Sequence, residues 1–368
     1  MKKIEGASEA PVFIAGNKYA RDNGRAVNDM SAFSIGDIEA EPGTKTSGFL
    51  PSEGLGMPDG TGNFWNIPVV IVNGAAEGPV FEVDGCMHGD EQEGAYTVLE
   101  LYRRLDPAEL RGTFVGVPVL NVPGFLSFNG VRGSLTDQMY VDMNRQFPGD
   151  PDSMSHTRRA IHTFWNEVVL KCNYTVNLHG CMKAQVPRVV YNEDSPETLR
   201  MAEAIACTPD WIVASRSEHT RLREDTINRA CTERGIPNVF IESGSGDRGH
   251  AALMADVEVI VDGITNCMRA CGMLDGEMRV PPVRRYTSYY THIRGRSAGI
   301  IYPEPCLRID NLVKEGDLLC RIVDFTGKEI DRVHAPHDGI VLMEPNHVSV
   351  GPEAGICLLG YPPEVKKT

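Results

Sequence analysis

The sequence PVFEVDGCMHGDE, at residues 79–91, joins two patterns from which the rest of the chain can be interpreted. Its first half is an apolar, β-branched run that is typical of a buried strand. Its second half is polar, and Gly89 allows the backbone to turn tightly between His88 and Glu91. Ligands of open α/β sheets gather outside the carboxyl ends of the strands. A polar cluster at the end of a buried strand therefore indicates a candidate site.

Similar apolar runs recur along the chain and alternate with helical patterns. Residues 92–104 place apolar groups at helical spacing and end in two arginines. Further strands are expected at 67–74, 113–124, 173–180 and 238–246, and further helices at 153–171, 195–206, 222–234 and 250–273. Buried strands that alternate with helices predict an α/β fold, with a mixed, largely parallel sheet sandwiched by helices.

The flanking segments differ from this central part. Residues 1–64 are rich in glycine, proline, aspartate and asparagine, so we expect loops with short strands there. After Gly272, short strand patterns with turn signals replace helical periodicity. We therefore divide the chain into an N-terminal strand and loop extension (1–64), a central α/β domain (65–278) and a small all-β C-terminal domain, a barrel or sandwich (279–368).

The composition argues against several classes of protein. Fifty acidic and 36 basic residues give a net charge of −14, which disfavours general binding to nucleic acid or to anionic membranes. Ten cysteines in 368 residues, with no CxxC pair, are too sparse for a disulfide scaffold. The chain shows neither a signal peptide nor a run near the ~18 apolar residues of a membrane span. We therefore expect a soluble, cytoplasmic protein.

Two histidines and one glutamate lie where strands are expected to end. His88 and Glu91 follow one strand, and His179 ends another, NYTVNLHG at 173–180. Taken singly, each has an ordinary structural explanation, because H-x-x-E pairs are common by chance and a histidine can simply end a strand. Taken together, two imidazoles and one carboxylate leave a fourth position open, which is the pattern of catalytic zinc sites.

Further charged residues lie in similar positions. Glu242 ends the strand in FIESGSG, and a carboxylate beside a metal-activated water is the expected general base; a surface or helix-capping role is the alternative. In DMNRQFPG, at 142–149, Asn144 and Arg145 can hold a planar carboxylate. Arg132 could polarise a carbonyl and hold an oxyanion. For either arginine, a solvated surface position is the alternative.

The order of these motifs resembles the succinylglutamate desuccinylase/aspartoacylase family, a branch of the zinc carboxypeptidase fold group. The motifs in chain order are HGDE, NVPGF, R-x4-D, DMNRQFPG, NLHG and FIESGSG. The resemblance covers about residues 65–275 as a catalytic domain and extends to a β-rich C-terminal domain. There, HAPHDGIVL, at 334–342, is similar to biotinyl/lipoyl-like barrels.

The resemblance implies roles for the residues at the strand ends. His88, Glu91 and His179 would bind one zinc ion per chain. Glu242 would be the general base, taking a proton from water and passing it to the leaving amine. Arg132 would polarise the scissile carbonyl.

The resemblance also implies substrate contacts. Asn144 and Arg145 would hold the substrate carboxylate. Arg188 and Tyr191, in VPRVVYNED, are candidates for substrate selection, with core packing as the alternative for Tyr191. The chain departs from the family at Asn177, where the family commonly has an aspartate that could orient the third metal ligand.

The resemblance implies a zinc-dependent amidohydrolase that deacylates a small N-acyl amino acid, with an N-acetyl-diamino-acid deacetylase as the first subtype. Two alternatives stay open: a metallocarboxypeptidase that trims peptides, and a catalytically silent small-molecule binding protein of the same fold. The expected partner is a small anionic N-acyl substrate. The sequence leaves the oligomeric state open, and a homo-oligomer is one alternative.

Overall fold

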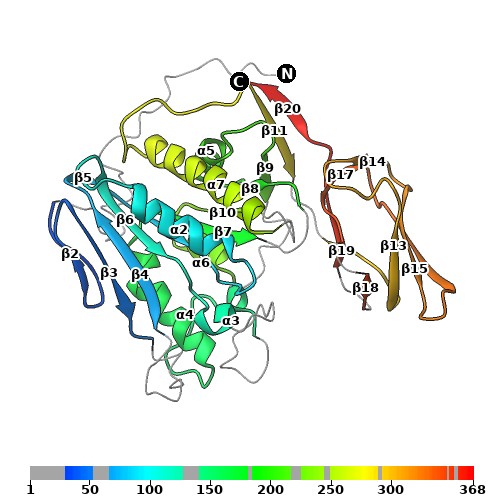
Figure 1. Ribbon diagram of the computed structural model, residues 1–368, viewed down its shortest axis with the longest axis horizontal. Helices are drawn as coiled ribbons and strands as arrows, with labels where there is room; N and C mark the ends of the chain where they lie inside the picture. The colour runs from blue at the N-terminus through cyan, green and yellow to red at the C-terminus, as the bar shows by residue number, and fades with distance from the viewer. Residues whose placement is uncertain are drawn as a thin grey trace.

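One large mixed sheet organises the computed structural model, which describes residues 30–52, 66–126, 141–180, 185–216, 225–243, 249–288, 292–345, 348–351 and 355–368 (Figure 1). Its strands are β3 (Thr44–Leu50), β4 (Ile67–Asn73), β5 (Ala76–Asp84), β6 (Arg111–Val117), β7 (Tyr174–Gly180), β8 (Arg188–Asn192), β9 (Ile212–Arg216), β10 (Asn238–Ser243), β11 (Val283–Ser288) and β20 (Glu364–Lys367). Their order across the sheet is β20-β11-β9-β8-β10-β7-β5-β6-β4-β3.

The centre of the sheet is parallel. β6, β5, β7 and β10 pair in parallel with one another, whereas β8 joins β10 antiparallel. β4 pairs antiparallel with both β3 and β6 towards one edge. The central strands are buried on both faces, which explains why their sequences are continuous apolar runs. The mixed, largely parallel sheet expected from the sequence is confirmed.

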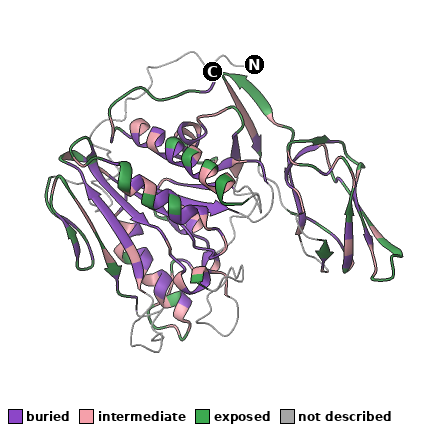
Figure 2. Cartoon of the chain, in the orientation of Figure 1, coloured by how far each residue is buried: buried purple, intermediate pink, exposed green. Residues whose placement is uncertain are grey.

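Helices cover both faces of this sheet and form two cores (Figure 2). One core includes residues of α2 (Glu93–Arg104), α5 (Pro196–Ile205) and α7 (His250–Ala270). The other includes residues of α4 (His156–Glu167) and α6 (Ile227–Glu233), with the short η2 (Val169–Lys171) beside them. On β5, Phe81 and Val83 enter the first core and Val80 enters the second, because successive side chains of a strand alternate between faces.

The two flanking segments contain short strands, as their sequences indicate. β1 (Phe33–Ile35) and β2 (Ile38–Ala40) form a two-stranded hairpin near the N-terminus. In the C-terminal part, two four-stranded sheets enclose a separate apolar cluster. Their strands are β12 (His292–Arg294), β13 (Gly299–Pro303), β14 (Leu312–Val313), β15 (Leu318–Val323), β16 (Glu329–His334), β17 (Gly339–Met343), β18 (Ser349–Val350) and β19 (Gly355–Gly360).

The way in which this all-β part joins the large sheet was not predicted. β11 pairs in parallel with β9, and β20, the last strand of the chain, pairs antiparallel with β11. The β-rich segment is therefore inserted between two neighbouring strands of the large sheet. It also packs on that sheet, since Ile340 and Leu342 share an apolar cluster with Val190 and Phe240. The boundary at residue 279 stays a prediction.

Within the described residues, no helix is long and apolar enough to cross a membrane.

The carboxylate of Glu82 lies on the face of the sheet that carries the second core. Glu82, on β5, is fully buried, and neither of its carboxylate oxygens has a hydrogen-bond partner among the described residues. Its neighbours in register are Val115 on one side and Thr175 on the other. Burial raises the pKa of Glu82 well above its usual range, and the nearby charge of Asp84 raises it further. Burial therefore favours the protonated, neutral form of the Glu82 carboxyl group in the folded protein.

Replacing Glu82 by glutamine should stabilise the fold increasingly as the pH rises. The folded protein holds the Glu82 proton more tightly than the unfolded chain does, so the wild type loses stability as the pH rises above the unfolded pKa of about 4.3. Glutamine carries no titrating proton. The difference in melting temperature between Glu82→Gln and the wild type should widen as the pH rises above about 5. The exposed Glu39→Gln is the control, and a difference for Glu82→Gln that does not change with pH would contradict this account.

Candidate active site

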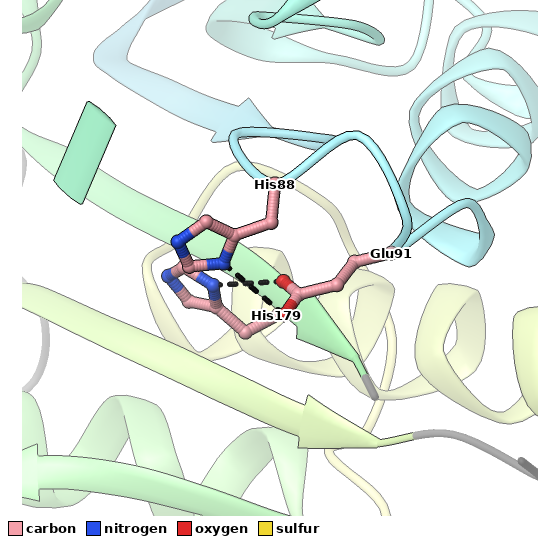
Figure 3. A group of neighbouring side chains, drawn as sticks. All are labelled: His88, Glu91 and His179. Atoms are coloured by element: carbon pink, nitrogen blue, oxygen red, sulfur yellow. Dashed lines mark hydrogen bonds and ion pairs between the residues drawn. The ribbon is translucent and has the colours of Figure 1, made fainter. Parts of the chain in front are cut away.

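The three expected metal ligands meet at the carboxyl ends of β5 and β7 (Figure 3). His88 and Glu91 lie in the turn between β5 and α2, and His179 is the penultimate residue of β7. The two Glu91 oxygens lie 3.1 Å from His88 Nδ1 and 3.0 Å from His179 Nδ1. One ligand atom from each residue lies within 4.8 Å of the others, and all three side chains are buried. The fold thus forms a compact donor set from residues that are 91 positions apart at most.

Close backbone packing holds the turn that carries His88 and Glu91. The amide of Asn121 donates to the carbonyl of Cys86 at 3.0 Å, and Cys86 has a φ of +52°, which is uncommon for a residue with a side chain. A Cβ on Gly89 would lie 2.1 Å from the carbonyl carbon of Gly124, at the short helix α3 (Val122–Leu126). Gly89 is therefore required because the backbone of α3 approaches so closely.

Asp142 orients the first histidine, and the sequence analysis did not assign it a role. Its Oδ1 lies 3.0 Å from His88 Nε2 and also accepts from the amide of Asn144. A carboxylate on Nε2 favours the tautomer in which Nδ1 keeps its lone pair, and Nδ1 is the atom that faces Glu91. The only signal in the sequence was an acidic residue at the start of DMNRQFPG.

The electrostatics of the cluster favour positive charge between these groups. Burial by itself lowers the pKa of His88, but Glu91 and Asp142 outweigh burial and raise it to about 10. Burial likewise raises the pKa of Glu91, but His88 and His179 outweigh it and hold this pKa far below its usual range. A divalent cation can take the place of such protons. The donor set of two imidazoles and one carboxylate therefore fits a metal ion.

Asn144 and Arg145 lie beside this cluster in the short helix η1 (Met143–Arg145). Asn144 is buried: its Oδ1 accepts from the amide of Ile227 at the start of α6, and its Nδ2 lies 3.5 Å from His179 Nε2. Arg145 is partly exposed, and its Nη2 lies 3.8 Å from Asp142 Oδ2. Asn144 is thus held by protein groups, whereas Arg145 can reach solvent.

Glu242 lies on the same face of the sheet as His179. The two residues are register partners in the parallel pair β10–β7, and the Glu242 side chain is 20% exposed. On the other side of β10, the register partner of Glu242 is Arg188. The Arg188 Nη2 lies 3.6 Å from Glu242 Oε2. A carboxylate next to the candidate metal ligands that still reaches solvent has the position expected of a general base.

One predicted site residue, Tyr191, does not join this group. Tyr191, on β8, packs against the core that contains Val189 and Ile241, on the face of the sheet opposite to Glu242. These contacts correspond to the packing alternative for Tyr191 and give no support to substrate binding. Arg132 lies outside the residues that the structure describes.

The acidic group that the sequence lacks at position 177 comes from the neighbouring strand. Asp84 on β5 is the register partner of Asn177, whose Nδ2 donates to Asp84 Oδ2. The Oδ1 of Asn177 accepts from Asn238 on β10 at 2.8 Å. Burial raises the pKa of Asp84 to about 6, although Asn177 and His179 lower it. One carboxylate and two carboxamides thus bridge β5, β7 and β10, two residues before the candidate metal ligand His179 on β7.

Introducing the aspartate that the family commonly has at 177 should destabilise this protein. Asn177→Asp places a second buried carboxylate against Asp84 and removes its donor, so we expect a loss of about 3 kcal/mol in the free energy of unfolding. The double variant Asp84→Asn with Asn177→Asp exchanges the two groups and should recover most of this loss. Urea unfolding measures both values. A single variant as stable as the wild type, or a double variant no better than the single one, would disprove the account.

The fold and the site together define an α/β protein with a His-Glu-His group at its strand ends whose donor atoms fit a metal ion. The succinylglutamate desuccinylase/aspartoacylase catalytic domain matches residues 78–268, just over half of the chain, and the chain therefore belongs to this family. The resemblance inferred from the ordered motifs is confirmed. Membership of the family supports hydrolytic enzyme activity.

Individual relatives extend this result. The N-alpha-acetyl-L-2,4-diaminobutyric acid deacetylase of Halomonas elongata is 26% identical over 287 residues, 75% of this chain and 80% of the relative. The product-bound ectoine utilization protein EutE (DoeB) of Ruegeria pomeroyi aligns with a TM-score of 0.75 at 21% identity, over 91% of this chain and 100% of that chain. A succinylglutamate desuccinylase/aspartoacylase of Rhodobacter sphaeroides aligns with a TM-score of 0.72 at 21% identity, over 90% of this chain and 99% of that chain. The two structures confirm the fold, including the C-terminal strands.

Proposed function

We propose that this protein is a zinc-dependent deacylase that hydrolyses the amide bond of a small N-acyl amino acid, with an N-acetyl-diamino acid as the first substrate class. The observation that carries the proposal is the position of Glu242, which pairs in register with His179 beside the His88–Glu91–His179 group. A binding protein would need no solvent-reaching carboxylate at that place. The Halomonas elongata deacetylase supports the substrate class.

The donor set supports zinc as the ion. Two histidine nitrogens and one glutamate oxygen are the ligands of several catalytic zinc sites, whereas magnesium and calcium prefer oxygen ligands alone. His88, Glu91 and His179 would hold the ion, and Asp142 would keep His88 in the tautomer that binds it. When bound, zinc supplies Lewis-acid polarisation of a carbonyl and lowers the pKa of water towards about 7.

Residues of the chain itself would transfer the protons and bind the substrate during hydrolysis. Glu242 takes a proton from the attacking water, whose oxygen bonds to the carbonyl carbon, and then gives a proton to the nitrogen as the C–N bond breaks. Arg145, which is partly exposed beside Asp142, would hold the substrate carboxylate. Arg132 keeps its predicted role at the carbonyl oxygen. The products are a free carboxylate and an amine.

Zinc-loaded protein should release acetate from N-acetyl-2,4-diaminobutyrate, and removal of the metal should abolish the activity. The assay compares this substrate with N-acetylaspartate, N-succinylglutamate and a short peptide, before and after chelation and after zinc is restored. Elemental analysis should find one zinc per chain. Release of a C-terminal residue from the peptide alone would indicate a carboxypeptidase, and binding of all acyl compounds without turnover would indicate a binding protein.

Replacing Glu242 by glutamine should remove turnover but keep the metal. General base catalysis contributes about 10²–10⁴-fold, so kcat should fall by that factor while zinc content stays at the wild-type level. Glu193→Gln, an exposed position after β8, is the matched control and should leave kcat unchanged. Near wild-type turnover of zinc-loaded Glu242→Gln would show that Glu242 is not the base.

A further inference from the structure

Arg188 is a cationic side chain inside the protein core that the proposed reaction does not use. Its relative exposure is 1%, so it cannot touch a substrate that enters from solvent. It lies on β8, next to the apolar cluster of Val190, Ile212 and Phe240. An ionised group in such surroundings is tolerated only when charged and hydrogen-bonding partners compensate for the lost water. The partners of Arg188 therefore indicate why it is there.

Those partners join Arg188 to the end of β10. Its Nη1 donates to Gln185 Oε1 and to the carbonyl of Val186, both at 3.2 Å, and its Nη2 faces Glu242 Oε2 at 3.6 Å. Gln185 in turn donates through Nε2 to the carbonyl of Ser243 at 2.5 Å. Arg188 and Gln185 thus hold two successive residues of β10, one by its side chain and the next by its backbone.

The C-terminal β-rich segment secures this arrangement. The amide of Val186 donates to the carbonyl of Leu342 on β17 at 2.8 Å, and Gln185 forms a β-bridge with Met343. Leu342 and Met343 also pack in the cluster that contains Val186. The chain just before β8 is therefore bridged to β17 by backbone contacts, which restrains the groups that hold the Arg188 guanidinium.

We propose that Arg188 is a positioning residue for the reaction: it holds the Glu242 carboxylate on the face of His179, and β17 holds Arg188. The inference rests on the proposed role of Glu242 as the base. A side chain that is 20% exposed can otherwise rotate away from the ligands, and proton transfer requires the carboxylate within hydrogen-bond reach of the reacting water. The ion pair with a fixed, buried guanidinium restricts that rotation without contact between Arg188 and the substrate.

The kinetic test replaces Arg188 by methionine and by lysine in the full-length, zinc-loaded protein. Arg188→Met should lower kcat by about 10–100-fold, the size of effect typical for groups that orient a catalytic side chain, with KM within about threefold and zinc content unchanged. Arg188→Lys keeps the charge and should recover part of kcat, as should added guanidinium with Arg188→Ala. Arg284→Met is the matched control, because Arg284 lies on β11 of the same sheet, two strands from β8 and on the side away from β10. It is also largely buried and faces Glu203 on α5.

A structural readout keeps the test independent of activity. Crystal structures of the wild type and of Arg188→Lys or Arg188→Met should show the Glu242 carboxylate displaced from its place beside His179 in the variants. An unmoved carboxylate, an unchanged kcat, or an equal loss of kcat in Arg284→Met would overturn the inference. If the wild type cleaves no N-acyl amino acid, the proposed function fails, and the position of the carboxylate still decides whether Arg188 holds Glu242.

Discussion

The parallel pairing of β7 with β5 and β10 is the constraint on which the site depends. Parallel strands in register end at the same edge of a sheet, so the turn after β5, His179 on β7 and Glu242 on β10 come together there. A slip of one residue in β7 would turn His179 to the other face. Val176 and Leu178 exclude that slip, because it would move them out of the first core and put polar side chains such as Asn177 into it.

The face of the sheet that carries the site also carries buried polar groups. The free-energy cost of burying each group is offset in a different way. Asp84 accepts a hydrogen bond from Asn177, Arg188 faces Glu242, and burial raises the pKa of Glu82 and so favours its uncharged form. The three candidate metal ligands form a local centre that favours a cation, within a chain whose net charge is −14. Net charge therefore describes the surface of this protein and not its site, since buried groups respond to partners a few ångströms away.

Much of the fold could be predicted from local patterns. Apolar runs located β5, β7 and β10, because strands that are buried on both faces of a parallel sheet have continuous apolar sequences. Helical spacing of apolar residues located α2 and α7. His88, Glu91 and His179 could be proposed because each follows such a run. The role of Asp142 and the pairing of Arg188 with Glu242 could not be predicted. Each depends on a contact between residues that are 54 positions apart in the sequence. The return of β20 to the large sheet left no local signal.

The sequence by itself determined the class of fold, the three candidate metal ligands and the candidate base, and the order of its motifs identified the family. Only the tertiary structure decided which partners hold those groups: Asp142 on His88, Asp84 beside Asn177, and Arg188 on Glu242. The tertiary structure also places Tyr191 against the core on the opposite face of the sheet, and not in the site where the sequence analysis had put it. The physical reason is that periodicity reports how each residue is buried, whereas register and strand order, set by backbone pairing across the whole sheet, determine which buried residues meet.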